Sequence, residues 1–468
     1  MRRLVRRLSL GLLLLASVPG LSGCTLAMSY DQCSEDADCP MVEGQPRYCT
    51  SDHLCVQDTP EERLCTSTLP EQPAMNATHV GLLLNLPTEQ EHLNVLRVAI
   101  DDVNEQLALD AIKPLVLDVC NVRRSARDAV NATRVLTEQR GVPAILGPND
   151  SDLVEGMFSA ATAVNVPVVS PSAMAGAVAD LPTQGLLFRM APLDRLQGQQ
   201  LARVVPSAAA NPSAVVAVLS VQDPYGDSVS KAFVESWKAR DPSRNLVRLK
   251  FTYREDDTAQ RDMVLARILE TRPDHLVLVP GAASAAFILK QLAALPFVAG
   301  DPSRTSQIYV SASGRVNELL AQAADSTLKD HFSRVQGVAP LTYSTSTEGV
   351  EFRSEYETKY KMADEPLIAY TNDALYVVAA AIASAKGRTS SDQILSVLRR
   401  LNDSKLTLSV SRSTLLDTAR RLAQGDAATL SGATGAIRFQ FDGSREPALF
   451  EKWTVDTTNK AFVNTPVM

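Results

Sequence analysis

Cysteine is the residue type whose pattern carries the clearest chemistry. The chain has 7 cysteines, and six of them follow position 24: Cys33, Cys39, Cys49, Cys55, Cys65 and Cys120. Residues 24–75 hold five of these six and few aliphatic side chains, so disulfides rather than a hydrophobic core should hold that segment together. The spacing does not choose among the pairings. We expect Cys33 with Cys49, Cys39 with Cys55, and Cys65 with Cys120.

A zinc site built from these cysteines and His53 is the alternative. The spacing lacks the short C-x2-C loops typical of zinc sites, and exported thiols tend to oxidise, so we expect no metal. The histidines are scattered without the spacing of metal ligands: His53, His79, His92, His275 and His331. The sequence contains neither a Gly-x-Ser-x-Gly elbow in a strand-turn-helix context nor a Walker A loop. We therefore expect no catalytic residue, no enzyme activity and no cofactor.

The first 23 residues have the pattern of a secretory signal. Met1 to Arg7 carry four arginines, an apolar run from Leu8 to Val18 follows, and Leu21-Ser22-Gly23-Cys24 looks like a lipobox. Cys24 would then be the lipidated N-terminus of a bacterial envelope protein, and this lipid would be its only membrane attachment. Thr25 follows Cys24, in place of the aspartate associated with retention in the inner membrane, which favours the outer membrane.

The charge balance excludes nucleic acid as a partner. Acidic residues number 53 against 46 lysines and arginines, for a net charge of −7, and no basic stripe recurs along the chain. Binding to a phosphate backbone requires such a stripe.

From Asn76 onward, short apolar runs alternate with helical stretches. A first series comprises Val80 to Leu86, Leu115 to Val119, Ala144 to Gly147 and Val166 to Ser170; a second comprises Ala214 to Leu219, Val247 to Tyr253, His275 to Val279 and Ile308 to Ser311. This alternation predicts an α/β fold of two lobes, each a parallel sheet flanked by helices. The stripe Leu93, Leu96, Ile100, Val103 and Leu107 repeats at helical spacing and should be buried.

The chain after about residue 335 should complete both lobes. Val350 to Lys361 and Ala369 to Ala385 look helical, while Gly435 to Phe441 and Phe450 to Val455 predict a pair of strands separated by Asp442-Gly443. Repeated crossings would make a hinge around an interlobe cleft. The expected domains are the signal peptide at 1–23, a Cys-rich tether at 24–75, lobe 1 at 76–190 completed by about 335–400, and lobe 2 at 191–334 completed by about 401–468.

A series of short motifs between residue 76 and about residue 456 resembles the leucine/isoleucine/valine-binding family. In order they are Val80-Gly81-Leu82-Leu83-Leu84, Ala144-Ile145-Leu146-Gly147-Pro148, Val166 to Ala173, Phe188-Arg189-Met190-Ala191-Pro192, Asp194 with Gln197-Gly198, Asp223-Pro224-Tyr225-Gly226 and Thr434 to Phe439. The resemblance implies a type I periplasmic substrate-binding protein of an ABC transporter. A small amino-acid-like ligand and a permease would be its partners.

The resemblance also implies where a ligand would bind. In this family, hydroxyls and backbone N–H groups at loops that open helices hold the ligand carboxylate. The ligand-binding positions implied here are Asn149, Asp150, Ser151, Ser172, Ala173 and Met174 on lobe 1, with Asp223, Tyr225 and Gly281 on lobe 2. Asp150 and Ser172 would equally serve as helix caps, and Asp223 and Tyr225 as parts of a turn. Tyr370 and Asp373 should be structural.

Two departures from the family pattern bear on the ligand. The loop Asn85 to Glu91 is short and acidic, and both Asp150 and Asp152 lie where a ligand carboxylate would be expected. They would repel it unless they point away, so the ligand would be cationic or no small ligand would bind. The alternative function is an outer-membrane lipoprotein that uses the same fold for contact with an envelope protein or for regulating envelope biogenesis.

Overall fold

The chain folds as two compact units, Met1–Thr59 and Pro60–Met468. The computed structural model describes residues 33, 38–41, 48–49, 55–56, 62–123, 125–206, 214–240, 247–297, 305–360, 367–386, 389–402 and 404–467. The expected signal peptide at 1–23 and the expected lipidation site Cys24 lie outside the described residues. Within the described ranges, no helix combines the length and the apolar character needed to cross a bilayer.

Cysteines form the buried centre of the N-terminal unit. A disulfide joins Cys39 to Cys55, as expected, and Cys33 is also disulfide-bonded; the side chain of Cys49, its expected partner, is outside the described set. Strands β1 (Tyr48–Cys49) and β2 (Cys55–Val56) pair in antiparallel fashion. The sulfur atoms of Cys33, Cys39 and Cys55 lie within 4.8 Å of one another, but oxidised sulfurs are not the thiolates that bind zinc. Crosslinking accounts for their proximity.

The first lobe is built on a six-stranded sheet. In spatial order its strands are β3 (Ser67–Leu69), β5 (Leu115–Asn121), β4 (Thr78–Leu84), β6 (Ile145–Leu146), β7 (Val168–Ser170) and β8 (Leu187–Arg189). All neighbours are parallel except β3, which runs antiparallel to β5. Its helices are α1 (Gln90–Leu109), α2 (Ala126–Arg134), continued by a π-helical turn (Val135–Gln139), α3 (Ser151–Ala163) and α4 (Gly176–Ala179). The predicted stripe of α1, from Leu93 to Leu107, is buried.

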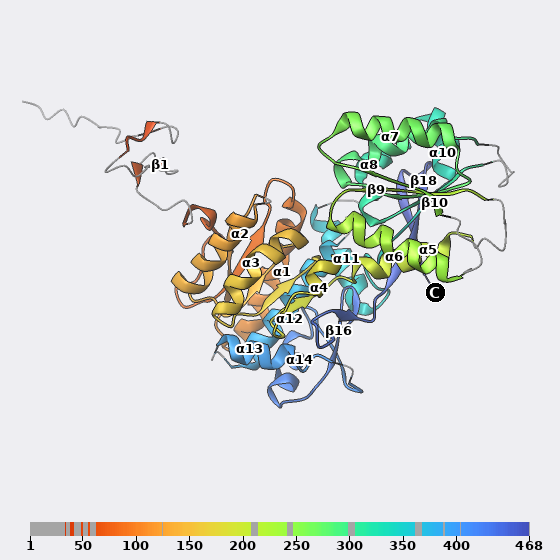
Figure 1. Cartoon of the computed structure of the whole chain (residues 1–468). Helices are drawn as coiled ribbons and strands as arrows, with labels where there is room; N and C mark the ends of the chain where they lie inside the picture. Colours follow the sequence, from red (N-terminus) through yellow and green to blue (C-terminus); the bar gives the residue numbers. More distant parts are fainter. Residues whose placement is uncertain are drawn as a thin grey trace, which may run out of the picture. The chain divides into compact units, whose positions relative to one another are not determined.

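The second lobe is a seven-stranded sheet between two layers of helices (Figure 1). Its strands are β10 (Val247–Tyr253), β9 (Val216–Val221), β11 (His275–Val279), β12 (Gln307–Val310), β13 (Val335–Pro340), β18 (Phe450–Asp456) and β19 (Ala461–Pro466), the last two antiparallel. Helices α5 (Asp194–Val204) and α6 (Pro224–Arg240) cover one face; α7 (Thr258–Thr271), α8 (Ala282–Gln291), α9 (Asn317–Gln322) and α10 (Lys329–Ser333) belong to the other.

Alternation along β9 shows why this sheet is covered on both sides. Val216 and Val218 join the core cluster that contains residues of α5 and α6, whereas Ala217 and Leu219 join the cluster of α7 and α8. Successive side chains of a strand point to opposite faces, so an uninterrupted apolar run requires two apolar partners.

The tail is divided between the lobes differently from the sequence-based expectation. Helices α12 (Ile368–Ser384), α13 (Ser391–Leu398) and α14 (Leu415–Ala423) add to the lobe 1 core, together with buried residues such as Leu430 and Phe439. These last two belong to a small sheet of β14 (Thr407–Ser409), β15 (Thr429–Gly432), β16 (Gly435–Phe439) and β17 (Arg445–Glu446). The expected assignment of 401–468 to lobe 2 is therefore corrected, because only β18 and β19 join that sheet.

The expected strand pair around Asp442-Gly443 also needs correction. That turn joins β16 to the short β17, whereas β18 pairs with β13 and β19. The remaining helix of the tail, α11 (Thr347–Tyr360), follows β13.

The chain passes between the lobes three times, at residues 190–193, 341–346 and 447–449. At the second and third passages, Arg315 Nη1 donates to the Thr342 hydroxyl at 2.6 Å and to Glu451 Oε1 at 2.7 Å, and both charged side chains are buried. Leu341 N also donates to the Leu449 carbonyl at 3.0 Å. These contacts fasten two crossing segments side by side, which is the arrangement of a multi-strand hinge.

A second buried guanidinium fixes the first passage. Arg445 Nη1 donates to the Met190 carbonyl at 3.1 Å and to the Thr434 hydroxyl at 2.6 Å. The turn at Thr434 is held in place by Asp373, which accepts the N–H groups of Ala433 at 2.7 Å and Thr434 at 2.9 Å. Asp373 is fully buried, in keeping with the structural role expected of it.

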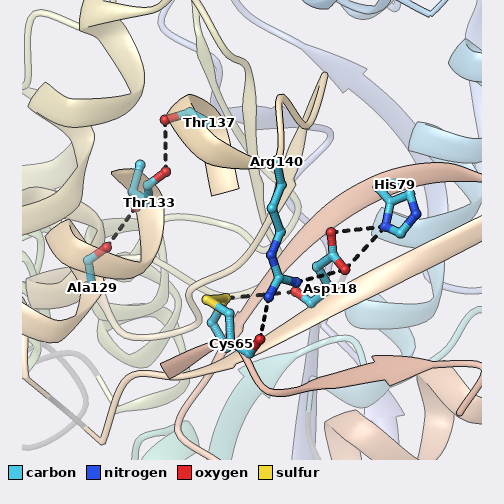
Figure 2. Close-up of a disulfide and its surroundings, with 8 residues drawn as sticks. Cys65, His79, Asp118, Ala129, Thr133, Thr137 and Arg140 are labelled. Carbon is cyan, nitrogen blue, oxygen red and sulfur yellow. Dashed lines mark hydrogen bonds and ion pairs between the residues drawn. A yellow bond between two sulfur atoms is a disulfide. The ribbon is translucent and has the colours of Figure 1, made fainter. Parts of the chain in front are cut away.

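The start of lobe 1 is fastened to its sheet covalently and by charge (Figure 2). Cys65 forms the expected disulfide with Cys120 at the end of β5, so the Cys-rich segment expected at 24–75 reaches into lobe 1. Beside it, buried Asp118 accepts from Arg140 at 2.9 Å and lies 3.1 Å from His79 Nδ1, and Arg140 also donates to the Cys65 carbonyl at 2.5 Å. The ionic cluster therefore supports the attachment of β3.

We predict that Asp118→Asn lowers the free energy of unfolding by about 2 kcal/mol, because Arg140 loses its buried ionic partner. Urea unfolding measures this change. Glu357→Gln is the control, since it breaks the exposed Arg353–Glu357 pair and should change stability by less than about 0.5 kcal/mol. Equal small effects of the two substitutions would contradict a stabilising role for the Asp118 cluster.

Candidate functional site

A cavity of about 450 Å³ lies between the two lobes, at the carboxyl ends of their parallel strands. Its volume is within the usual range of small-molecule sites, and this edge of an α/β sheet is where ligands usually bind. The lining residues are Glu89, His92, Asn149, Asp150, Ser151, Asp152, Leu153, Ser172, Met174, Asp194, Asp223, Pro224, Tyr225, Ala282, Ala312, Ser313, Arg315, Val316 and Leu367.

The cavity brings together most of the residues that the sequence indicates. The members of the expected set found in the lining are Asn149, Asp150, Ser151, Ser172, Met174, Asp223 and Tyr225. Ala173 is outside it, because this residue is buried and its N–H donates to Ser170 Oγ at 3.1 Å. Gly281 is also outside; its N–H donates to the Tyr253 hydroxyl at 2.9 Å, and Ala282 lines the cavity instead.

The lobe 1 wall begins at a sharp turn after β6. Gly147 has a φ of +77°, and a β-carbon there would collide with the Leu83 carbonyl, so glycine is required. The chain then reaches Asn149, which is 6% exposed and whose side-chain amide has no hydrogen-bond partner within the described part of the chain. An amide in this state can both donate to and accept from a ligand.

Both hydroxyls of this wall bond within the protein. Ser151 Oγ accepts the N–H of Ala175 at 3.0 Å, and Ser172 Oγ donates to the Asn149 carbonyl at 3.3 Å. They orient the loops against each other.

The lobe 2 wall is the N-terminal turn of α6. Asp223 Oδ1 accepts the N–H of Gly226 at 2.6 Å and so caps the helix. The Tyr225 hydroxyl donates to Gln197 Oε1 at 2.6 Å, and burial together with the nearby Asp194 carboxylate raises its pKa to about 12. Tyr225 is therefore a neutral, fixed aromatic group at the cavity wall.

Asp194 also lines the cavity. It belongs to one of the motifs that resemble the family, but it was not among the residues predicted to bind a ligand. It is the first residue of α5, is 1% exposed, and neither of its carboxylate oxygens has a hydrogen-bond partner among the described residues. Burial, reinforced by the Asp223 carboxylate, holds the pKa of Asp194 well above its usual range, while Arg189 acts in the opposite direction. Its burial depends on the packing of α5, which the spacing of the motif does not reveal.

The lining is acidic. Its carboxylates are Glu89, Asp150, Asp152, Asp194 and Asp223. His92 lies 2.6 Å from the Thr371 hydroxyl, and burial lowers its pKa to about 4, so it is neutral at pH 7. Arg315 is the one arginine or lysine in the described lining, and Glu451 already pairs with it. Such a cavity repels an anionic solute and attracts a cationic one.

Residues 87–424 match the periplasmic binding protein family. The chain belongs to this family. Its members bind solutes and are not enzymes, which agrees with the expectation drawn from the sequence. No curated protein matches this periplasmic binding protein.

Solved structures show the same fold at low sequence identity. The branched-chain amino acid transporter substrate-binding protein LivJ from Streptococcus pneumoniae, in complex with isoleucine, has a TM-score of 0.63 at 18% identity and covers 84% of this chain and 100% of its own. The leucine-binding protein LivK from Thermotoga maritima has a TM-score of 0.63 at 17% identity, covering 83% and 98%. An ABC transporter solute-binding protein from R. palustris, in complex with benzoate, gives 0.61 at 15%, covering 83% and 96%. These likenesses confirm the bilobal fold of this periplasmic binding protein.

We predict that Asp194→Asn stabilises the ligand-free periplasmic binding protein at pH 7 by on the order of 1 kcal/mol. The folded-state pKa of Asp194 is raised above its unfolded value of about 4, so the penalty for burying the carboxylate is absent below that pH and grows as the pH rises. Urea unfolding at pH 4, 5.5 and 7 should show the difference between variant and parent increasing with pH. A loss of stability at pH 7 would show that the carboxylate has a structural role.

Proposed function

We propose that this periplasmic binding protein is the solute-binding component of an ABC transporter and captures a small polar solute in the interlobe cavity. The cavity carries the proposal: loops from both sheets line it, and three crossing segments join the lobes beside it. Closure of the lobes around a solute would exclude water and strengthen the polar contacts. Family membership and the fold shared with LivJ and with the benzoate-binding protein support this function.

The energetic demand on such a site is modest. A dissociation constant of 1 μM corresponds to about 8 kcal/mol of binding free energy, which a few buried polar contacts and apolar walls can supply. Asn149, Asp194 and Arg315 are lining groups with buried polar atoms that lack hydrogen-bond partners in the described structure. Each would gain a partner from a solute bound beside it.

We further propose that the protein is anchored in the bacterial envelope, facing the periplasm, through a diacylglycerol on Cys24. The run Leu21-Ser22-Gly23-Cys24 supports this anchor, and Thr25 favours the outer membrane over the inner membrane. A location in the outer membrane would separate the protein from an inner-membrane permease and is the observation in favour of the alternative, a lipoprotein that contacts another envelope protein.

The test of solute capture is thermal unfolding of the mature chain without its lipid, screened against amino acids, small peptides, polyamines and aromatic carboxylates. A solute that binds only the folded state should raise the midpoint by several degrees, and small-angle scattering should show a smaller radius of gyration as the lobes close. The double variant Tyr225→Ala, Asp223→Ala should lose the shift. A flat screen with protein shown to be ligand-free by native mass spectrometry would favour the protein-contact function.

The anchor is tested separately. Cys24→Ala should remove the mass of the acyl chains and leave residues 1–23 uncleaved, which mass spectrometry of the purified protein measures. A variant with the same mass difference and the same processed N-terminus as the parent would contradict lipidation at Cys24.

A further inference from the structure

We propose that the solute is an organic cation that lacks a carboxylate, with its ammonium or guanidinium group bound by Asp194 and Asp223. This inference rests on the proposed solute-binding function and names the chemical class of its substrate.

Asp194 is the first observation. Its side chain lines the cavity, is 1% exposed, and has two carboxylate oxygens without a hydrogen-bond donor in the described part of the protein. The positive charge of Arg189 lowers the pKa of Asp194. The two side chains nevertheless form no ion pair among those found in the described residues, and Arg189 pairs with Asp442 instead. A buried carboxylate without donors destabilises the fold unless a donor arrives, and an ammonium or guanidinium group supplies charge and donors together.

Asp223 and Tyr225 extend this site from the opposite lobe. Asp223 uses one oxygen to cap α6, and its charge adds to the burial that raises the pKa of Asp194. Burial also raises the pKa of Asp223 itself. Two neighbouring carboxylates repel each other until a cation lies between them. The ring of Tyr225, fixed through its hydroxyl to Gln197, lines the same part of the cavity and is a suitable surface for a cation.

The helix ends explain why the solute should lack a carboxylate. A helix N-terminus ordinarily offers free N–H groups and partial positive charge to an anion. Here five helices that begin at or beside the cavity carry an acidic residue at the N-cap or in the first turn, or receive one from a neighbouring loop: Glu89 for α1, Asp150 and Asp152 for α3, Asp194 for α5, Asp223 for α6 and Glu255 for α8. Helix α12, whose N-cap Leu367 also lines the cavity, has no acidic residue in its first turn.

Two of these carboxylates accept hydrogen bonds from backbone N–H groups at the starts of α6 and α8. Asp223 accepts from Gly226, and Glu255 accepts from the N–H of Ser284 at 2.9 Å and from its hydroxyl at 2.7 Å. At the starts of α6 and α8, the protein's own carboxylates thus occupy positions that could bind the anionic end of an amino acid. Arg315 also lines the cavity, and its Nε and Nη2 have no hydrogen-bond partner among the described residues, but its charge is balanced by Glu451, which lies 2.7 Å from Nη1. The acidic lining therefore disfavours the carboxylate of a zwitterionic amino acid and favours an organic cation.

Isothermal titration calorimetry with matched probes tests this inference on the lipid-free mature chain. Agmatine and cadaverine are arginine and lysine without their carboxylates, so each pair differs by the one group in question. We expect agmatine or cadaverine to bind with micromolar affinity and its parent amino acid to bind at least about tenfold more weakly. Isoleucine and benzoate are the neutral and anionic comparisons.

Substitutions locate the cation. Asp194→Asn and Asp223→Asn should each weaken binding by about 30-fold or more, since each removes one charge from a desolvated pair. The amide oxygen of Asp223→Asn can still cap α6, and Asp194→Asn should fold at least as well as the parent. Asp227→Asn, on the first turn of α6 but outside the lining, is the matched control and should change affinity by less than about threefold.

The outcomes separate the two proposals. Binding of isoleucine, arginine or benzoate in preference to the cations would overturn the cationic class and leave solute capture intact. Binding of no probe of any class would overturn both proposals. Cation binding that survives Asp194→Asn would overturn the assignment of the site, and preferential binding of Mg²⁺ or Ca²⁺ added alone would overturn an organic ligand.

Discussion

Three passages of the chain between two lobes are the constraint on which the rest of this structure depends. Two buried guanidinium groups hold those passages: Arg445 at the first, and Arg315, through Thr342 and Glu451, at the second and third. Buried charges with this many partners cannot be exchanged for water without loss of stability. The cavity residues lie close to these anchors in sequence, since Asp194 follows the first passage and Arg315 itself lines the cavity. The hinge and the site therefore share Arg315.

The sequence predicts local elements well because the periodicity of apolar residues is a local property. The stripe of α1 and the strands Val247–Tyr253 and His275–Val279 are found as the pattern indicates. The distribution of the tail between lobes was not predicted correctly, since β16 and β18 have similar alternation and nothing local says which sheet each joins. That choice depends on partners far away in sequence, β13 for one strand and β15 for the other.

The site, like the fold, could be predicted from the sequence only in part. Loops at the ends of parallel strands meet at one edge of a sheet, so a correct order of strands brings Ser151, Ser172 and Tyr225 to one cavity. Asp194 could not be singled out in this way, because an aspartate at a helix start is ordinarily an exposed cap. What makes it unusual is its complete burial, which results from the packing of α5 against α6 and from the short connection to β8.

The disulfide at the start of lobe 1 has a mechanical consequence. Cys65 lies two residues before the start of β3, a three-residue strand at the edge of the sheet, and is bonded to Cys120 in the adjacent β5. Tension on the segment before residue 65 therefore passes through a covalent bond into β5 and bypasses the few hydrogen bonds of β3, which such a load would otherwise peel away one at a time. Lobe 1 is thus the lobe that bears any pull from the N-terminal side, and lobe 2, connected only through the hinge passages, is free of that load.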